Sequence, residues 1–473
     1  MSSPGRFAAS PPRPGFAHGA RPSVPVARGV SVSVGTSVAG AARLPETRTP
    51  MLVVGLGDPV SDVLVQLDDA VAQRVFAKCG VDEPGGCLPV VSDDDITRLL
   101  TACAEAWVDG GYGEPDASTN HDTTNHTWEP SFCPGGSAAN VCKGVVNLSA
   151  GCVSRFVGMI GSDDVGDRYQ NALLKQNVET VLLRCADATV SSARCLSLVE
   201  RDGRRTMRTF LGASLHLGAS DFPSTQAFRG SPKLLHVEGY TLYRPELAKR
   251  AMREARARGA LVSLDLASFE VVRNCRASLV AILNENLVDL VFANEDEARE
   301  LLVGDTTSHE ARGFHERRQK QGKKGGASES NEEGTAATRD EDKDTFTRAD
   351  ADDAMRWLLR FCRVATVSLG ARGCVSLDRN GKKGIAPGVR VPVIDTTGAG
   401  DSFTAGYLAA YLNGATPQAC ASCGCAVGTQ AVQAVGAELS TAKWHELALV
   451  VQDVIMLDRE RNLALVEETA GAA

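Results

Sequence analysis

The sequence predicts an α/β protein built on a mostly parallel β-sheet with helices on both faces. Short apolar runs rich in β-branched residues alternate with amphipathic stretches such as residues 295–302. The runs are residues 51–57, 261–266, 289–293, 364–369 and 374–378. Near-continuous apolar strands of this kind are typical of a parallel sheet that is covered on both faces. Ligands bind such sheets at the carboxyl ends of the strands, where Asp265, Asn294, Gly370 and residues 395–401 fall.

One pair of segments departs from this pattern. Residues 194–200 and 204–210 alternate polar and apolar side chains and are joined across Asp202-Gly203. An Asp-Gly pair between two alternating runs is a strong signal for a β-hairpin. We therefore expect an antiparallel hairpin in addition to the parallel sheet.

The composition is that of a folded protein that binds small molecules. The 473 residues are 43% hydrophobic and 23% charged, with a formal net charge of -8. A negative charge argues against nucleic acids and anionic membranes as partners, and no run approaches the roughly 20 apolar residues that a membrane span needs. We therefore expect an anionic ligand to be held by local backbone groups and a metal ion.

Three regions differ in composition from the predicted core. Residues 1–50 are rich in Pro, Ala, Ser, Gly and Arg, which is similar to an organelle transit peptide and equally typical of an unstructured cytosolic tail. The expected location is the cytoplasm, with a plastid or mitochondrion as the alternative. Polar insertions at about 108–130 and 304–350, the second expected to be disordered, interrupt one domain of residues 51–455. Residues 456–473 then form a C-terminal tail.

Fourteen cysteines are scattered along the chain. Without a secretory leader we expect them to be reduced and mostly buried. Cys420, Cys423 and Cys425 form the one cluster, which lies in an Ala- and Gly-rich helical stretch. A metal site would need further ligands, so small buried residues are the favoured interpretation there.

The strongest functional motif is residues 395–401 (DTTGAGD), between a strand-like run at 391–394 and a small-residue helix at 402–412. Unpaired N–H groups of Gly398, Ala399 and Gly400 at the start of a helix could bind phosphate oxygens. Asp401 could then take a proton from an attacking hydroxyl. The alternative is a tight turn whose Asp only favours the helix dipole. The motif is neither a Walker A loop nor a dinucleotide-binding loop.

Together with residues 402–407, this motif resembles the second signature of the PfkB (ribokinase-like) family of sugar and nucleoside kinases. Residues 135–140 (GGSAAN) resemble the first signature, residues 294–297 (NEDE) match an Asn-x-x-Glu element, and residues 55–62 resemble the opening strand and turn. These elements follow the family's order from about residue 51 to 450. The departures include Cys142, where the family has Ser, Thr or Ala, and Asp58, where Asn is commoner.

The resemblance implies a ribokinase-like fold with a small β lid, built from strands at about 58–67 and 194–210, and an ATP-dependent kinase that uses Mg2+. A monovalent cation supports the anion-binding turn in some members of the family. The implied site consists of the base Asp401, the anion hole Gly398, Ala399 and Gly400, the acceptor-binding Asp62, Gly135, Gly136 and Asn140, the nucleotide-binding Asn294, Gly370 and Gly373, and Glu297 for the metal.

The acceptor is less sharply indicated. Residues 58–62, 67–69 and 262–266 look more like the adenosine-kinase branch than the bacterial sugar kinases. We therefore expect a ribonucleoside that is phosphorylated on its 5'-hydroxyl, with ribose or fructose as the alternative. Phe156 and Tyr240 are candidates for stacking on a base. A non-catalytic relative is the third possibility, but the presence of Asp401 and the glycine turn favours an enzyme.

Overall fold

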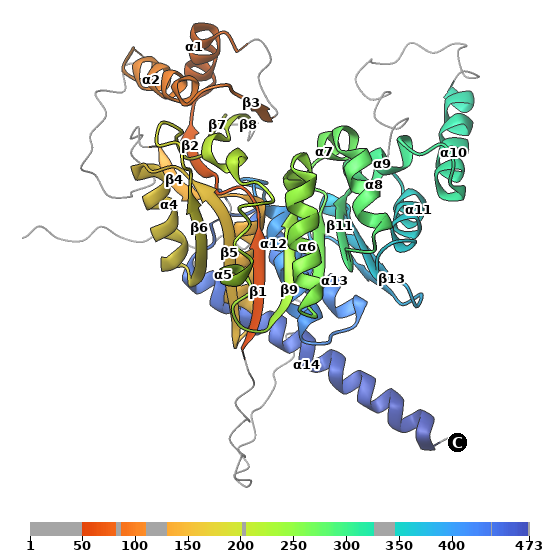
Figure 1. Ribbon diagram of the computed structural model, residues 1–473. Helices are drawn as coiled ribbons and strands as arrows, with labels where there is room; N and C mark the ends of the chain where they lie inside the picture. Colours follow the sequence, from red (N-terminus) through yellow and green to blue (C-terminus); the bar gives the residue numbers. More distant parts are fainter. Residues whose placement is uncertain are drawn as a thin grey trace, which may run out of the picture. The chain divides into compact units, whose positions relative to one another are not determined.

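The computed structural model describes residues 50–81, 87–109, 130–200, 205–325, 346–436 and 438–471. Within them a nine-stranded sheet runs in the order β14-β13-β12-β11-β10-β9-β1-β5-β6 (Figure 1). All neighbouring strands are parallel except β13, which is antiparallel to both its neighbours. In chain order the strands are β1 (Met51–Leu56), β5 (Cys152–Ile160), β6 (Val178–Arg184), β9 (Pro232–Glu238), β10 (Leu261–Asp265), β11 (Leu290–Asn294), β12 (Val364–Ser368), β13 (Cys374–Asp378) and β14 (Lys383–Ala386). The predicted mostly parallel sheet is confirmed.

The strand-like run at residues 391–394 is not a strand. Val393 is 61% exposed and Ile394 is 51% exposed, and neither pairs with the sheet. The Ile394 N–H instead donates to the carbonyl oxygen of Val432, at 2.8 Å. The apolar residues of this run therefore belong to an irregular segment that is fixed to the end of a helix, and the prediction of a strand was wrong.

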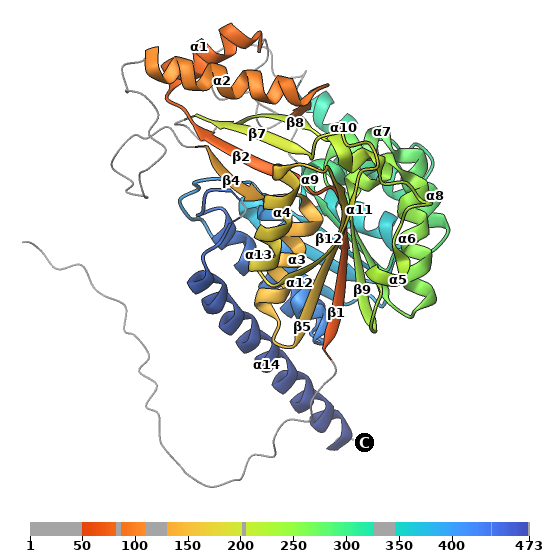
Figure 2. The same ribbon diagram turned by 60° about the vertical axis from the view of Figure 1, so that its left-hand side comes forward.

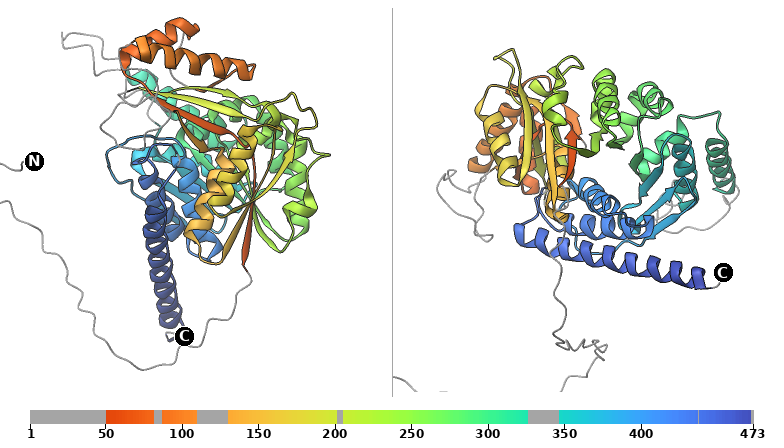
Figure 3. Two further views of the ribbon diagram at one scale, coloured as in Figure 1. Left: turned by 90° about the vertical axis from the view of Figure 1, so that its left-hand side faces the viewer. Right: turned by 60° about the horizontal axis from the view of Figure 1, so that its bottom comes forward.

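Four helices cover one face of the large sheet: α3 (Ser137–Leu148), α12 (Ala399–Leu412), α13 (Pro417–Ala431) and α14 (Thr441–Gly471). Their apolar side chains, such as Val141, Phe403 and Trp444, form one buried cluster with Val53 and Phe292 from the strands. Figure 3 shows α14 running along the outside of this layer, and its last turns include the predicted C-terminal tail. Within the described ranges, no helix, α14 included, combines the length and the apolar composition that a membrane span requires.

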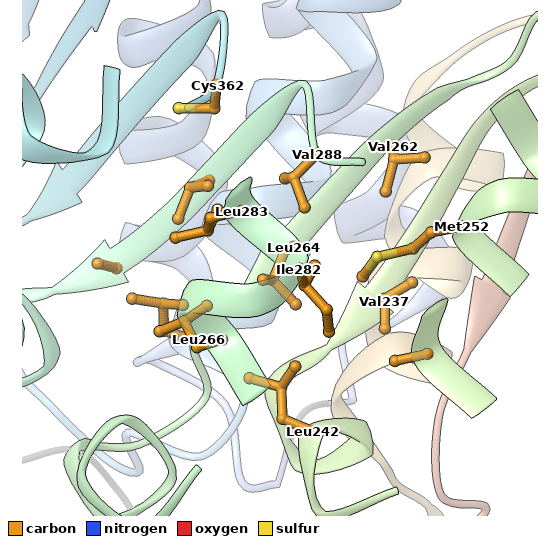
Figure 4. Close-up of a cluster of buried hydrophobic side chains, with 14 of the residues drawn as sticks. Val237, Leu242, Met252, Val262, Leu264, Leu266, Ile282, Leu283, Val288 and Cys362 are labelled. Atoms are coloured by element: carbon orange, nitrogen blue, oxygen red, sulfur yellow. The ribbon is translucent and has the colours of Figure 1, made fainter. Parts of the chain in front are cut away.

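The opposite face is covered by a second group of helices and a larger hydrophobic core. These helices are α5 (Ser224–Ala227), α6 (Pro245–Ala257), α7 (Phe269–Asn274), α8 (Arg276–Asn284), α9 (Glu295–Val303) and α11 (Arg348–Leu359). Figure 4 shows part of this core, in which Val237, Val262 and Leu264 of the strands meet Met252 and Ile282 of the helices. Helix α4 (Asp164–Lys175) packs near the β6 edge and contributes to a smaller core with α3.

A separate five-stranded sheet has the order β3-β8-β7-β2-β4. Its strands are β2 (Ser61–Gln66), β3 (Cys87–Pro89), β4 (Ser131–Pro134), β7 (Arg194–Val199) and β8 (Arg205–Phe210). Strands β7 and β8 are antiparallel, which confirms the predicted hairpin, although its Asp-Gly turn lies outside the described residues. Helices α1 (Asp69–Cys79) and α2 (Asp93–Asp109) lie over this small sheet in Figure 2 and share a hydrophobic cluster with β2 and β7.

The second polar insertion contains more structure than its composition predicts. Helix α10 (His309–Gly325) occupies much of it, so the expectation of disorder was wrong for these residues. Ala311 and Phe314 of α10 are buried, and Arg317 forms ion pairs with Asp350 and Asp353. A few anchoring contacts therefore hold a helix whose sequence is otherwise polar. Residues 326–345 of this insertion, the middle of the first insertion and residues 1–49 lie outside the described part, and the predicted domain boundaries stay predictions.

The cysteines fill space in the cores. None of the thirteen cysteines whose side chains the structure describes is in a disulfide, and ten of them are buried. Of the predicted cluster, Cys420 and Cys423 are buried, while the half-buried Cys425 contacts Cys374 on β13, with 3.5 Å between their sulfur atoms. Burial raises the pKa of the Cys423 thiol to about 12, so this side chain stays protonated and packs as a small apolar residue.

Candidate active site

Asp401 lies in the first turn of α12, and residues of α3 hold its carboxylate. Ser137 Oγ donates to Asp401 Oδ1 at 2.7 Å, and Asn140 Nδ2 donates to Oδ2 at 2.8 Å. Burial raises the pKa of Asp401, while the two donors and the charge of Lys143 act in the opposite direction. The result is an oriented carboxylate that is a stronger base than a carboxylate in water.

The turn before Asp401 leaves backbone donors free. Gly398 precedes α12 in the left-handed conformation, with φ of 66°, which only glycine adopts at little cost. The Ala399 N–H makes a long bond of 3.3 Å to the carbonyl oxygen of Thr396. The N–H groups of Gly398 and Gly400 have no acceptor among the residues that the structure describes. Gly400 is exposed, and a Cβ added to it would have no atom within 4 Å.

The two glycines of the first signature form a tight loop against the start of the small sheet. The Gly135 N–H donates to the carbonyl oxygen of Val60 at 2.8 Å. A Cβ on Gly135 would lie 2.0 Å from Asp62 Oδ2, and a Cβ on Gly136 would lie 2.3 Å from the Asp58 carbonyl oxygen. A side chain at Gly135 would therefore displace the carboxylate of Asp62, which is predicted to bind the acceptor. A side chain at Gly136 would displace the opening turn at Asp58. This loop leads directly into α3, whose Ser137 and Asn140 contact the predicted base.

Glu238, at the carboxyl end of β9, ties the same two loops together. Its side chain is 1% exposed, and its two oxygens accept the N–H groups of Asp58 at 2.7 Å and Ala138 at 2.9 Å. Burial and the neighbouring Asp58 raise the pKa of Glu238 to about 8. Asp58 itself is 4% exposed and pairs with Arg244. The departure from Asn at position 58 is therefore accommodated by an ion pair beneath the loop.

Asn294 and Glu297 form a reciprocal capping box at the start of α9. The Asn294 side chain accepts the Glu297 N–H at 2.9 Å, and Glu297 Oε2 accepts the Asn294 N–H at 2.8 Å. A further bond of 2.6 Å joins Asn294 Nδ2 to Glu297 Oε1. Glu297 is 2% exposed, and burial together with Asp265 raises its pKa well above the usual range. The pair thus orders the end of β11, and its carboxylate has no oxygen without a partner.

Asp265 links the two halves of the site. It ends β10 and accepts the Ala267 N–H at 2.8 Å and the Thr404 hydroxyl of α12 at 3.3 Å. Burial, followed by the charge of Asp401, raises the pKa of Asp265 to about 7. Ala267 takes the left-handed conformation with φ of 65°, which is a strained state for a residue with a Cβ. Such strain is commonly found at functional sites.

The two glycines of the predicted nucleotide turn differ in their surroundings. Gly370 follows β12, has φ of 53° and is exposed. Gly373 has φ of 91°, and a Cβ there would lie 2.0 Å from the Ala386 carbonyl oxygen. Gly373 therefore lets two backbone segments approach, while Gly370 faces outward beside Glu295 at the start of α9.

Several residues of this site carry no sequence signal of their own. Ser137 and Thr404 lie inside the two signature motifs, and this membership was the one sequence signal that could have identified them. Their contacts with Asp401 and Asp265 become visible only in the structure. Glu238 ends an apolar run at residues 232–238 that was not recognised as a strand. Of the two aromatic candidates, Phe156 is fully buried against Tyr169, so its assignment as a stacking residue was wrong, while Tyr240 is 40% exposed.

Comparison with known proteins agrees with this arrangement. The sequence model of the pfkB family of carbohydrate kinases matches residues 113–323 and 330–444. The aminoimidazole riboside kinase of Salmonella typhimurium is 28% identical over 277 residues, which are 58% of this chain and 73% of the relative. The ribokinase of Haemophilus influenzae is 25% identical over 279 residues, with 59% and 74% covered. The probable fructokinase-7 of Arabidopsis thaliana is 26% identical over 289 residues, with 59% and 71% covered.

Solved structures share the fold. A probable sugar kinase from Rhizobium etli has a TM-score of 0.62 and 22% identity, with 85% of this chain and 99% of that chain covered. An adenosine kinase from Sinorhizobium meliloti has a TM-score of 0.60 and 23% identity, with 86% and 99% covered. The predicted ribokinase-like fold is therefore confirmed. Since the family model spans most of the sequence and its motifs meet around Asp401, the chain belongs to the pfkB family of carbohydrate kinases, phosphotransferases that act on a hydroxyl group of a sugar or nucleoside.

Proposed function

We propose that this protein transfers the γ-phosphate of ATP to the 5'-hydroxyl of a ribonucleoside, with Asp401 as the general base. The observation that carries the proposal is the carboxylate of Asp401, held by Ser137 and Asn140 beside two unpaired backbone N–H groups. Phosphoryl transfer needs little covalent chemistry from the protein, and positioning and charge stabilisation account for most of its catalysis.

Asp401 acts on the acceptor hydroxyl. Each of its oxygens already accepts one hydrogen bond from α3, and each keeps a lone pair for a further donor. As the hydroxyl attacks, its proton passes to this carboxylate, whose raised pKa favours the transfer. Asp62, which packs against Gly135, accepts hydrogen bonds from the vicinal hydroxyls of the acceptor and so sets its orientation.

The start of α12 stabilises the transferred group. The N–H groups of Gly398 and Gly400 are unpaired among the described residues, and the positive end of the helix dipole adds to them. Charge builds on the phosphoryl oxygens in the transition state, so fixed donors at this point lower the barrier. The Ala399 N–H joins them by giving up its long bond to Thr396.

The nucleotide and its metal ion are assigned to the carboxyl ends of β11 and β12. No group of three His, Cys, Asp or Glu side chains in the described ranges is arranged to hold a metal ion. Mg2+ usually keeps several waters and reaches a kinase on the phosphates of its nucleotide. The exposed Asn294 could contact those waters directly, whereas the buried Glu297, whose two oxygens bond to Asn294, would act on them through Asn294. Bound Mg2+ would neutralise charge on the phosphates. Gly370, which is exposed beside α9, fits close approach of the nucleotide.

Two lines of support bear on the acceptor. The opening turn and residues 262–266 resemble the adenosine-kinase branch, and solved adenosine kinases share the fold. The similarity to the aminoimidazole riboside kinase of Salmonella also supports a nucleoside-like acceptor, because that relative is named for its action on a riboside. A free sugar is the second candidate, favoured by relatives named as ribokinases and fructokinases. One relative is a chloroplastic fructokinase, and the plastid location stays a prediction beside the cytoplasmic one.

The test is an ADP-release assay with Mg2+ and ATP over a panel of adenosine, inosine, aminoimidazole riboside, ribose and fructose. We expect a nucleoside to give the highest kcat/KM, and Asp401→Asn to serve as the blank. General bases contribute about 10²- to 10⁴-fold, so this variant should lose at least a hundredfold in kcat while it still binds ATP. A preference for fructose or ribose would overturn the nucleoside assignment. Turnover by Asp401→Asn at the wild-type rate would overturn the assignment of the base.

A further inference from the structure

Tyr169 of α4 is a buried residue that neither signature motif explains. Its side chain is fully buried, and its ring packs at 6.3 Å, centre to centre, against Phe156. A buried tyrosine hydroxyl needs a hydrogen-bond partner. Here the hydroxyl donates to the carbonyl oxygen of Gly135 at 2.8 Å, which is backbone of the predicted acceptor loop.

Gly135 packs against the carboxylate of Asp62, the residue predicted to bind the acceptor. The N–H of Gly135 donates to the Val60 carbonyl oxygen, so the residue is held from both sides. The space that a Gly135 side chain would fill is taken by the Asp62 carboxylate. Its Cγ and both oxygens lie within 2.9 Å of the position that a Cβ would occupy. A shift of this peptide therefore moves the surface on which Asp62 rests.

Burial, together with the acidic groups around it, keeps the hydroxyl of Tyr169 protonated. Burial raises its pKa well above the usual value, and the acidic side chains of Glu238, Asp62 and Asp58 and the thiol of Cys142 act in the same direction. The phenol is thus a permanent donor, and the Gly135 carbonyl accepts from it at every working pH.

We propose that Tyr169 is a positioning residue for the acceptor: its hydroxyl fixes the Gly135 carbonyl and thereby sets the place of Asp62. This inference rests on the proposed function, in which Asp62 binds the acceptor. The competing explanation is a core tyrosine that only fills space beside Phe156. The two differ in their effects on the KM of the acceptor, because space filling does not need the hydroxyl.

The test is Tyr169→Phe, which keeps the ring and removes the hydroxyl. A neutral hydrogen bond contributes about 1 kcal/mol, so we expect the KM for the acceptor to rise roughly three- to tenfold. The KM for ATP should stay within about twofold, since the Tyr169 hydroxyl bonds to the acceptor-side loop and not to Asn294, Gly370 or Gly373, the described residues assigned to the nucleotide. The acceptor is adenosine, or ribose or fructose if the panel selects a sugar.

Tyr407→Phe is the matched control. Tyr407 is equally buried, and its hydroxyl pairs with Ser376 Oγ at 2.7 Å, between α12 and β13. We expect a similar fall in Tm for both variants but no change in the KM for the acceptor in Tyr407→Phe. Equal acceptor KM values in the two variants, or a parallel rise in the KM for ATP in Tyr169→Phe, would overturn the inference.

The double variant with Asp62→Asn separates this inference from the function on which it rests. If Tyr169 acts through Asp62, its substitution should add less than twofold to the KM for the acceptor in the Asp62→Asn background, whereas independent effects would multiply. Multiplying effects would overturn the positioning role alone. An Asp62→Asn variant with an unchanged KM for the acceptor would overturn the acceptor assignment and the inference together.

Discussion

Asn140 donates a 2.8 Å hydrogen bond to Asp401, from which it is separated by 261 residues of sequence. The bond joins the two signature motifs directly, because α3 and α12 pack side by side on one face of the large sheet. Ser137 makes a second bond to the same carboxylate, so one turn of α3 orients the predicted base. The predictions below test this arrangement.

Ser137→Ala should move the acid limb of the pH–rate profile to higher pH. The Ser137 hydroxyl stabilises the ionised form of Asp401, so its loss raises the pKa of the carboxylate. Catalysis requires the ionised form, and activity is therefore lost earlier as the pH falls. Measurement of kcat/KM between pH 5 and 9 checks the direction. An acid limb at the wild-type pH would show that the titrating group is not Asp401.

Asp265→Asn should leave the acid limb where it lies in the wild type. Burial and the charge of Asp401 raise the pKa of Asp265 to about 7, so Asp401 ionises first and Asp265 is still neutral when Asp401 titrates. A neutral Asn at position 265 therefore does not change the pKa of Asp401, and kcat/KM should fall with pH as in the wild type. Asn keeps an oxygen that can accept the Ala267 N–H. A limb that moved by as much as in Ser137→Ala would contradict this order of ionisation.

Gly398→Ala and Gly400→Ala should separate folding from catalysis. Gly398 has a positive φ, which costs a residue with a Cβ about 1–2 kcal/mol, so this variant should lose stability. Gly400 has room for a methyl group, so its variant should unfold at the wild-type temperature. That methyl group would point into the open space assigned to the phosphoryl group, and we expect kcat to fall tenfold or more. Thermal unfolding and steady-state kinetics on both variants are the measurements; wild-type kcat in Gly400→Ala would argue against the anion hole.

Gly55→Ala and Cys142→Ala should compensate each other. A Cβ at position 55 would lie 2.5 Å from the Cys142 sulfur, so Gly55→Ala alone should destabilise the protein by about 1–3 kcal/mol. In the double variant the new methyl group occupies the space that the sulfur leaves. Partial rescue is expected because the Ala138 carbonyl oxygen also lies 3.1 Å away. Denaturant unfolding of the three variants gives the coupling energy, and strict additivity would contradict this packing.

Much of the large sheet follows from local sequence. The apolar runs that became β1 and β10 to β13 have no competing pattern, so period and composition sufficed for them. The same reasoning failed at residues 391–394, where a short apolar run belongs to an exposed segment. It also failed at α10, where Phe314 and ion pairs to α11 stabilise a polar helix. Both failures arise because tertiary contacts override local composition.

The candidate site was only partly visible in the sequence. Asp401, Asn140 and the glycines belong to motifs of several residues, and the motifs were sufficient to place them. Glu238 and Tyr169 are single residues whose importance comes from backbone groups 100 and 34 positions away. No local pattern records such a contact, and it becomes visible only when the helices and strands are assembled.

The hydrophobic cluster that α1 and α2 share with the small sheet has a mechanical consequence. An element with its own core keeps its shape when it swings, because it gives up no internal packing as it does so. Opening and closing would then bend the four connections of this element to the rest of the fold, at residues 57–60, 135–136, 185–193 and 211, while the small sheet and its helices move as one body. The energetic cost of admitting each new substrate would then fall on these connections and leave the packing inside the small element intact.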